Sequence, residues 1–383
     1  MRSYRIASLP GRGSANPYVG LFYDALASHG IELVYELPID IKWLKRHASR
    51  LDAIHFHWPD SFLRMYNPVW WRYFRGLARR LPSAASDGLL RLMVWPKRVG
   101  GVWYLRKMLR VAKRAGLRVI WTFHNVEPHF GPDWADRQSY RMLAVNSDLI
   151  IFHSDFARDE CIRHYTPKGG LVVMPHGNYE GAFPEPRPRY RVLDGLGLNA
   201  DLPVVSCVGG MRNNKGLDIA IEAVSKLRGE VQLIVAGHPA GGFDVEELRD
   251  AMKGMPGTAF IPRLISDQEF ADFVASTDAV LLPYRQVTGS GALLAAITLG
   301  CGVVASDLPY FREIIEQEPD AGILVRPNDA NALAQGIKKY LECSGQIRKD
   351  AVRRLACRYK WSEVVGPVAR VLRRWAEQRD TPK

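Results

Sequence analysis

Residues 204–216 read VVSCVGGMRNNKG and form the most informative stretch of the chain. The apolar run at 204–208 is typical of a buried parallel strand, because strands covered on both faces are apolar throughout. Two glycines, an arginine and a lysine follow before the next helical pattern begins. In α/β proteins such a turn presents backbone N–H groups and cations to a phosphate. An ordinary glycine-rich turn with two solvated cations is the alternative.

Short apolar runs, expected as strands, alternate with longer amphipathic stretches along the whole chain of 383 residues. The first series lies at 4–9, 31–35, 53–56, 119–123, 149–152 and 171–174, and the second at 204–208, 232–236, 259–262, 279–282, 302–305 and 322–325. The proline-rich stretch 184–190 separates the two series and is expected to be a linker. The sequence therefore predicts an α/β protein with doubly wound domains at 1–183 and 191–360.

Basic residues are concentrated between residues 62 and 114. The chain carries a formal net charge of +12, and this segment alone holds 13 basic residues and one acidic residue. It also contains Trp70, Trp71, Trp95 and Trp103. Interleaved basic and aromatic residues at helical spacing favour a helix that docks on an anionic membrane surface. A solvated helical hairpin is one alternative; nucleic acid is a weaker one and is not expected, because no recognition module accompanies the segment.

The five cysteines are widely separated and form no C-x-x-C pair, so neither a disulfide framework nor a cysteine metal site is expected. His55 and His57 share one strand face, but no cysteine or E-x-x-H pattern accompanies them, and no metal ion is expected. No run approaches the roughly 18 apolar residues of a membrane-spanning helix, and residues 1–9 contain no apolar signal region. We therefore expect a cytoplasmic protein that is peripheral on the inner face of the membrane.

Motifs in both halves resemble those of glycosyltransferases with the GT-B fold. In the C-terminal half, a resemblance to the nucleotide-binding half of the large retaining family, the GT4-like one, rests on Gly209-Gly210-Met211-Arg212 with Lys215-Gly216, Ala236-Gly237, Leu282-Pro283-Tyr284, and the stretches 264–269 and 299–306. A narrower resemblance, to bacterial exopolysaccharide GDP-mannose:glycolipid β-1,4-mannosyltransferases of the xanthan type, rests on Ala15-Asn16-Pro17-Tyr18, His55-Phe56-His57-Trp58-Pro59, Thr122-Phe123-His124-Asn125 and Gly289-Ser290-Gly291. It implies an acceptor domain at 1–183 and a donor domain at 191–360, facing each other across a cleft. A C-terminal helix and tail at 361–383 would cross back to the first domain.

The expected reaction displaces a nucleoside diphosphate from an anomeric carbon by an acceptor hydroxyl. Preorganised donors must hold the leaving group, and we assign Gly210, Arg212, Lys215, Ser290 and Gly291 to the donor diphosphate. No D-x-D sequence occurs, so a metal-independent enzyme without a cofactor is expected, with GDP-mannose as the co-substrate. The resemblance adds His238, Tyr284 and Glu313 near the nucleotide or sugar, and Gly13, Asn16, His57 and Trp58 on the side of a lipid-linked acceptor.

An inverting transfer needs a base that takes the acceptor proton. Asp60 is the first candidate and Glu127 the second, although Asp60 is equally placed to cap the following helix. His124 is expected to contact the donor sugar, as a histidine does in related enzymes.

One departure concerns two glutamates that large GT-B families carry before the strand at 302–305. Here the positions fall at about Val287 and Ala295, so a catalytically inactive, membrane-associated homologue is one alternative. A transferase using UDP-glucose or UDP-glucuronate is another, because nothing in the chain identifies the donor base. A sugar-nucleotide epimerase shares the fold but has no use for a basic aromatic segment.

Overall fold

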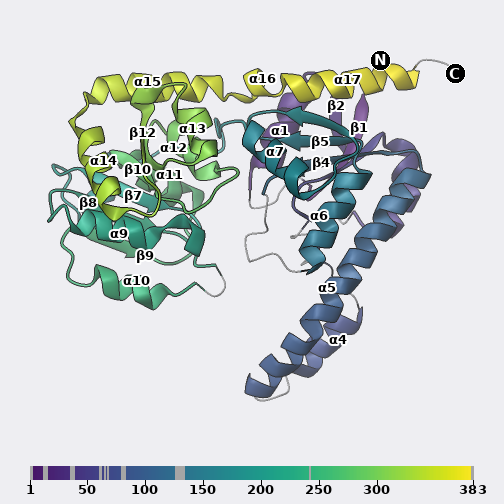
Figure 1. Ribbon diagram of the computed structural model, residues 1–383, viewed down its shortest axis with the longest axis horizontal. Coiled ribbons are helices and arrows are strands. Elements are labelled where there is room, and N and C mark those ends of the chain that lie inside the picture. The colour runs from purple at the N-terminus through teal and green to yellow at the C-terminus, as the bar shows by residue number, and fades with distance from the viewer. Residues whose placement is uncertain are drawn as a thin grey trace. The chain divides into compact units, whose positions relative to one another are not determined.

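The computed structural model describes residues 3–11, 16–34, 39–59, 63, 66, 69–78, 83–125, 134–240 and 243–380. The chain divides into two compact units, of which the first combines Met1–Pro175 with Val365–Lys383 and the second is His176–Val364. Each unit is built on a six-stranded sheet flanked by helices (Figure 1). The expected α/β fold of two Rossmann-like domains is therefore confirmed.

The polypeptide enters the second unit at His176, ahead of the proline-rich stretch 184–190 that we expected to be the linker. Part of that stretch packs on the second unit. The guanidinium and backbone N–H of Arg187 both donate to the Asp272 carboxylate at 2.7 Å, and Arg189 pairs with Asp278 at 2.9 Å. The prolines exclude regular helix at 184–188, and the two arginines anchor the chain to its own unit up to the start of α8 (Arg189–Gly195).

The first unit contains a sheet in the order β2-β1-β3-β4-β5-β6. Its strands are β1 (Tyr4–Leu9), β2 (Ile31–Val34), β3 (Ala53–Phe56), β4 (Arg118–Phe123), β5 (Leu149–Phe152) and β6 (Gly170–Val173). All pairings are parallel, with Phe56 opposite Trp121 and Phe123 opposite Phe152. Residues that directly follow β3, β4 and β5 therefore meet at one edge of the sheet.

The helices of the first unit are α1 (Tyr18–Ala27), α2 (Ile41–His47), α4 (Val69–Ala78), α5 (Ser83–Arg114), α6 (Trp134–Asn146), α7 (Asp155–His164) and the C-terminal α17 (Gly366–Asp380), with the short η1 (Ala48–Arg50) after α2. Helix α17 belongs to this unit, as expected for a crossing-back helix. It contacts the sheet through Trp375, whose ring centroid is 6.5 Å from that of Tyr4, and through an Arg379–Asp52 ion pair of 2.7 Å.

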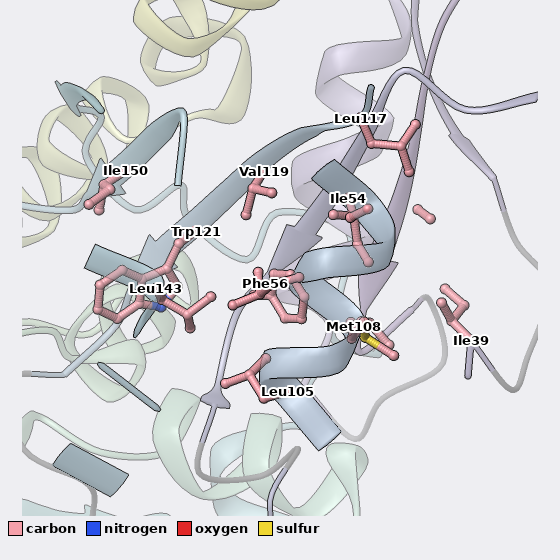
Figure 2. Close-up of a cluster of buried hydrophobic side chains, with 14 of the residues drawn as sticks. Ile39, Ile54, Phe56, Leu105, Met108, Leu117, Val119, Trp121, Leu143 and Ile150 are labelled. Carbon is pink, nitrogen blue, oxygen red and sulfur yellow. The ribbon is translucent and has the colours of Figure 1, made fainter. Parts of the chain in front are cut away.

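Helix α5 has 32 residues, and its C-terminal half is anchored in the core. There Leu105 and Met108 are fully buried against Phe56 and Trp121 of the sheet (Figure 2). The N-terminal half runs away from the sheet with α4 beside it (Figure 1). None of the described helices, α5 included, combines the length and apolar content needed to cross a lipid bilayer.

The second unit contains a sheet in the order β12-β11-β10-β7-β8-β9, again with parallel pairings. Its strands are β7 (Val204–Val208), β8 (Gln232–Ala236), β9 (Thr258–Ile261), β10 (Ala279–Leu282), β11 (Val303–Ser306) and β12 (Gly322–Val325). Its helices are α8 (Arg189–Gly195), η2 (Asn213–Lys215), α9 (Leu217–Ser225), α10 (Val245–Met252), α11 (Asp267–Ala275), α12 (Gly291–Thr298), α13 (Pro309–Ile315), η3 (Pro319–Ala321), α14 (Ala330–Glu342), α15 (Gly345–Arg358) and α16 (Trp361–Val364). Each predicted strand is present within one residue of its expected bounds.

Candidate functional site

The loop at 209–216 leaves the buried strand β7 at the carboxyl edge of its sheet and is fixed by backbone contacts on both sides. The Met211 N–H donates to His238 O at 2.9 Å, and Asn214 O accepts from Arg285 N at 2.9 Å. Glycine is required at two contact points. A Cβ at Gly216 would lie 2.0 Å from the carbonyl oxygen of Pro283, and one at Gly237 would lie 1.9 Å from that of Gly209. The loop is therefore wedged between the strand ends of β8 and β10.

Lys215 is held by an aromatic residue from the neighbouring strand end. Its Nζ donates a hydrogen bond to the Tyr284 hydroxyl and lies 3.9 Å from the centroid of the Tyr284 ring. Tyr284 is buried and packs on Phe311 of α13 at a centroid distance of 5.3 Å. Because an ammonium group has three donors, two remain for a ligand oxygen. Tyr284 and Lys215, which sequence reasoning placed separately, thus form one unit.

Arg212 is half-buried at the start of η2, and its side chain folds back toward the glycines. A Cβ built at Gly210 would lie 4.0 Å from Arg212 Nε and 4.0 Å from His238 O. The loop thus brings together Gly210, Arg212 and Lys215, three of the five residues expected at a diphosphate. Arg285 lies beside them and pairs with Asp218 at 2.6 Å, while donating to Asn213 O at 2.7 Å. This arginine was not predicted, although it directly follows the Leu-Pro-Tyr motif.

Two tyrosines pack against the turn before α12, in which Ser290 is buried. Ser290 Oγ accepts from Leu293 N at 3.2 Å and so caps the helix, and a Cβ at Gly291 would lie 2.6 Å from the Tyr179 hydroxyl. The Tyr310 hydroxyl is hydrogen-bonded to the Ser290 backbone, and burial raises the pKa of this phenol. The side chain of Ser290 is therefore committed to the helix cap, and Tyr179, a residue missed from sequence, covers the first turn.

The remaining predicted residues of the second unit lie at the same edge. His238 is exposed after β8, and Glu313 is exposed on α13, which follows β11. Of the positions where related families carry glutamates, Val287 is half-buried, and Ala295 is buried within α12. The Ala295 position therefore presents a methyl group to the core.

Four histidines gather at the carboxyl edge of the first sheet, together with Trp58 and Tyr18. His57 Nδ1 lies 3.3 Å from His124 Nε2, and the Trp58 ring stacks on His124 with centroids 4.4 Å apart. The edge of the Tyr18 ring contacts His57, His124 and His153 at centroid distances of 5.5, 4.9 and 5.4 Å. The structure thus joins His57, Trp58 and His124, which were expected on the acceptor and sugar side, and adds Tyr18.

The buried members of this cluster are neutral at physiological pH. Burial lowers the pKa of His55 to about 3 and that of His153 to about 4, and it holds the pKa of His57 well below the ordinary value. His55 is also fully hydrogen-bonded, to the Tyr23 hydroxyl at 2.7 Å and to Thr122 Oγ1 at 2.8 Å. Among the described residues, no group of histidines, cysteines or acids is arranged to hold a metal ion.

Asn16 lies at the start of α1, where its Oδ1 accepts from Tyr18 N at 3.0 Å. Three predicted residues, Gly13, Asp60 and Glu127, lie outside the described residues. Tyr18 belongs to a motif already noted in the sequence, but its role in ordering the histidines depends on contacts between separate strands. The two edges offer different chemistry: cations and backbone in the second unit, and neutral imidazole and aromatic rings in the first.

Comparison with known proteins identifies relatives for both halves. Residues 202–343 match the family model described as "Glycosyl transferases group 1". The chain is 26% identical over 273 residues to a GDP-mannose-dependent alpha-(1-6)-phosphatidylinositol monomannoside mannosyltransferase of Mycolicibacterium smegmatis, covering 67% of this chain and 71% of that protein. It is 22% identical over 293 residues to a GDP-mannose:glycolipid 4-beta-D-mannosyltransferase of Xanthomonas campestris, covering 76% of this chain and 70% of that protein. With an alpha-D-kanosaminyltransferase of Streptomyces kanamyceticus it shares 26% identity, and there the chain spans 63% of the relative's length.

Solved structures with the same fold cover nearly the whole chain. Sucrose-phosphate synthase from Thermosynechococcus elongatus matches 99% of this chain and 100% of its own, with a TM-score of 0.70 and 16% identity. Anabaena HepE in complex with UDP and glucose matches 96% and 99%, with a TM-score of 0.65 and 16% identity. Both are GT-B structures, so the expected GT-B fold is confirmed.

Proposed function

We propose that this chain, a GT-B glycosyltransferase with a group 1 domain, transfers mannose from GDP-mannose to a lipid-linked oligosaccharide. The acceptor would carry a polyprenyl diphosphate, and the product would enter an exopolysaccharide or another cell-surface glycan. The mannosyltransferases of Mycolicibacterium and Xanthomonas, whose names specify GDP-mannose and lipid acceptors, support the choice of donor and acceptor.

The observation that carries the proposal is the loop at 209–216 with Lys215 fixed on Tyr284. Backbone contacts and glycines set the path of the loop before any ligand arrives, and the hydroxyl and ring of Tyr284 hold the ammonium group. A preorganised cation of this kind stabilises charge that develops in a transition state without further reorganisation. A donor diphosphate gains that charge as it leaves.

In the proposed step, an oxygen of the acceptor hydroxyl bonds to the anomeric carbon while the bond from that carbon to the donor phosphate oxygen breaks. GDP leaves with the bonding electron pair, and Lys215 and Arg212 stabilise its diphosphate. The acceptor proton passes to a base, for which Asp60 is the candidate. His124, stacked on Trp58 and next to His57, would bind the transferred sugar.

We propose that the protein is located on the inner face of the cytoplasmic membrane, and exposed aromatic side chains support docking on a membrane surface. Tyr73 of α4, Trp95 and Trp103 of α5 and Trp134 of α6 are all exposed, in a region rich in arginine and lysine. Indole and phenol rings favour the boundary between lipid headgroups and acyl chains, and cations favour anionic headgroups. An enzyme docked through these helices would meet a lipid-linked acceptor at the surface.

Calorimetric titration with GDP-mannose, UDP-glucose and UDP-glucuronate tests the donor. We expect GDP-mannose to bind, and Lys215→Met to weaken its binding by about 2 to 3 kcal/mol, or roughly 30- to 150-fold, because a positioned cation is lost. Lys226→Met is the matched control, since Lys226 pairs with Glu222 on the surface at the far end of α9.

Binding of a UDP-sugar in place of GDP-mannose would replace the proposed donor while leaving the transferase assignment intact. Binding of none of the three would instead indicate an inactive homologue. If Lys215→Met bound GDP-mannose as tightly as Lys226→Met, the loop at 209–216 would not be the diphosphate site.

A further inference from the structure

Helices α5 and α6 lie side by side in the first unit (Figure 1). A groove of about 650 Å³ lies between them. One face of α5 supplies most of its wall, and α6 supplies the rest. The lining residues are Val102, Trp103, Arg106, Leu109, Arg110, Lys113, Arg114, Trp134, Gln138, Met142 and Asn146. None of them has a place in the donor or acceptor chemistry described above.

The topology gives the groove a direction. Both helices precede a strand of the parallel sheet, β4 after α5 and β5 after α6, so they run side by side in the same sense. Helix α6 begins with Trp134 on the side of the histidine cluster, and both helices end at the opposite edge. The groove therefore has an aromatic end, formed by Trp103 and Trp134, and a basic end, formed by Lys113 and Arg114.

The charges of the groove all have one sign. Arg106, Arg110, Lys113 and Arg114 line it, and no acidic side chain does. Arg106 lies over the Trp103 ring at 5.5 Å, whereas the other three cations form no ion pair with any residue that the structure describes.

Two cations close to the groove are paired with acids instead. Arg98 pairs with the buried Asp136 at 2.6 Å, and Arg118 pairs with Asp148 at 3.5 Å. The groove itself is lined by four cations and no acid, and this lining is suited to an anionic ligand.

The floor of the groove is apolar. Leu109 and Val102 are buried there, and Met142 is partly buried against the same core. Two exposed indoles, those of Trp103 and Trp134, lie at one end of the groove. Proteins that contact lipid commonly place tryptophan at the boundary between membrane and water. The bases of a nucleic acid would need aromatic rings to stack on along the row of cations, but both indoles of the groove lie at its aromatic end. An anionic head joined to an apolar chain matches both parts of the lining.

We propose that the α5–α6 groove binds one anionic phospholipid of the membrane, with its phosphate on Arg110, Lys113 and Arg114 and its glycerol and first methylenes over Leu109 and Met142. The proposal rests on the proposed function only for the membrane location. It differs from diffuse docking, in which every exposed cation near the surface contributes to a similar extent. Here the cations of the groove contribute most.

Flotation of the intact chain with vesicles separates the two possibilities. The vesicles are phosphatidylcholine with about one third phosphatidylglycerol, and pure phosphatidylcholine is the reference. The groove variant is Arg110→Gln with Lys113→Gln. The matched control is Lys107→Gln with Arg141→Gln, which removes one lysine and one arginine from exposed positions of the same helices outside the groove.

We expect the groove variant to lose at least about tenfold in vesicle partitioning and the control to stay within about twofold of the original protein. Equal losses in the two variants would overturn the groove site in favour of diffuse docking. Calorimetric titration with dihexanoyl phosphatidylglycerol below its micelle concentration gives a second readout. Inorganic phosphate that bound as tightly as this lipid would overturn the role of the apolar floor. No donor nucleotide is used, so failure of the proposed transfer would not change either result.

Discussion

Replacing Gly237 by alanine tests the close approach that shapes the candidate donor site. A Cβ there would lie 1.9 Å from the carbonyl oxygen of Gly209, whereas real Cβ atoms essentially never come within 3.0 Å of such an atom. The loops after β7 and β8 must therefore separate by roughly 1 Å. The φ angle of Gly237, +148°, is also one that L side chains rarely adopt.

The expected loss of stability combines these two effects. Backbone strain at such a φ costs about 1 to 3 kcal/mol, and a side chain forced into a packed site costs a similar amount. We expect Gly237→Ala to lower the free energy of unfolding of the second unit by about 3 to 4 kcal/mol. Gly254→Ala is the matched control, because its φ is +78° but nothing lies within 4 Å of its Cβ. Strain alone should cost about 1 kcal/mol there.

Hydrogen exchange under increasing urea, followed by mass spectrometry of peptides from β7 and β8, reports the opening free energy of this unit separately from the other. GDP-mannose affinity should fall further in Gly237→Ala than in Gly254→Ala, because the displaced loop carries Lys215. If the two variants had opening free energies within about 0.5 kcal/mol of each other, the close approach of Gly237 to Gly209 would not constrain the loop.

Three further predictions concern single residues of the candidate site. Because the depressed pKa values of His55 and His153 keep both neutral when folded, the unfolded chain binds more protons between pH 6.5 and about 4. The free energy of unfolding of the first unit should therefore fall by up to about 1.4 kcal/mol per pH unit for each histidine as the pH falls through this range; a flat urea midpoint from pH 7 to 5 would contradict this. Tyr284→Phe should weaken GDP-mannose binding by about 1 kcal/mol, less than Lys215→Met does, because the ring face beneath the Lys215 ammonium remains. If calorimetry gave the same loss of affinity for both variants, the hydroxyl alone would position the ammonium and the ring face would contribute nothing. Asp60→Asn should abolish transfer in a radiolabelled mannose assay and leave GDP-mannose affinity unchanged, and normal turnover would assign the base to another residue.

The fold was predictable because its signals are local. A parallel strand buried on both faces needs a run such as 204–208, and the glycines after it mark the turn at the strand end. The same holds for 53–56 and 149–152, where four buried residues form a strand. The parallel direction of the strands follows from the alternation of strands and helices, but their order in the sheet does not, because the two sheets share this alternation and differ in order.

Side-chain partnerships at the two edges were less predictable, since they join residues from separate loops. Nothing near Lys215 in the sequence shows that Tyr284 holds its ammonium, and nothing near Gly291 shows that Tyr179 lies 2.6 Å from its Cβ position. The basic segment was visible as composition, but its groove depends on α6, which lies 20 residues beyond the end of α5. Periodicity locates a helix without specifying which neighbour it faces.

Contacts from tyrosines show how the candidate donor site is organised without the two family glutamates. In the described part of the second unit, aromatic rings and backbone position the groups of the candidate donor site: Tyr284 holds Lys215, and Tyr310 is hydrogen-bonded to the backbone of Ser290. No described carboxylate pairs with Lys215, whereas the neighbouring Arg285 is paired with Asp218. A cation positioned by a neutral phenol keeps its full charge for a ligand, because no acid competes for it. We therefore expect the donor diphosphate to be held mainly by Lys215 and Arg212, with binding that weakens as ionic strength rises.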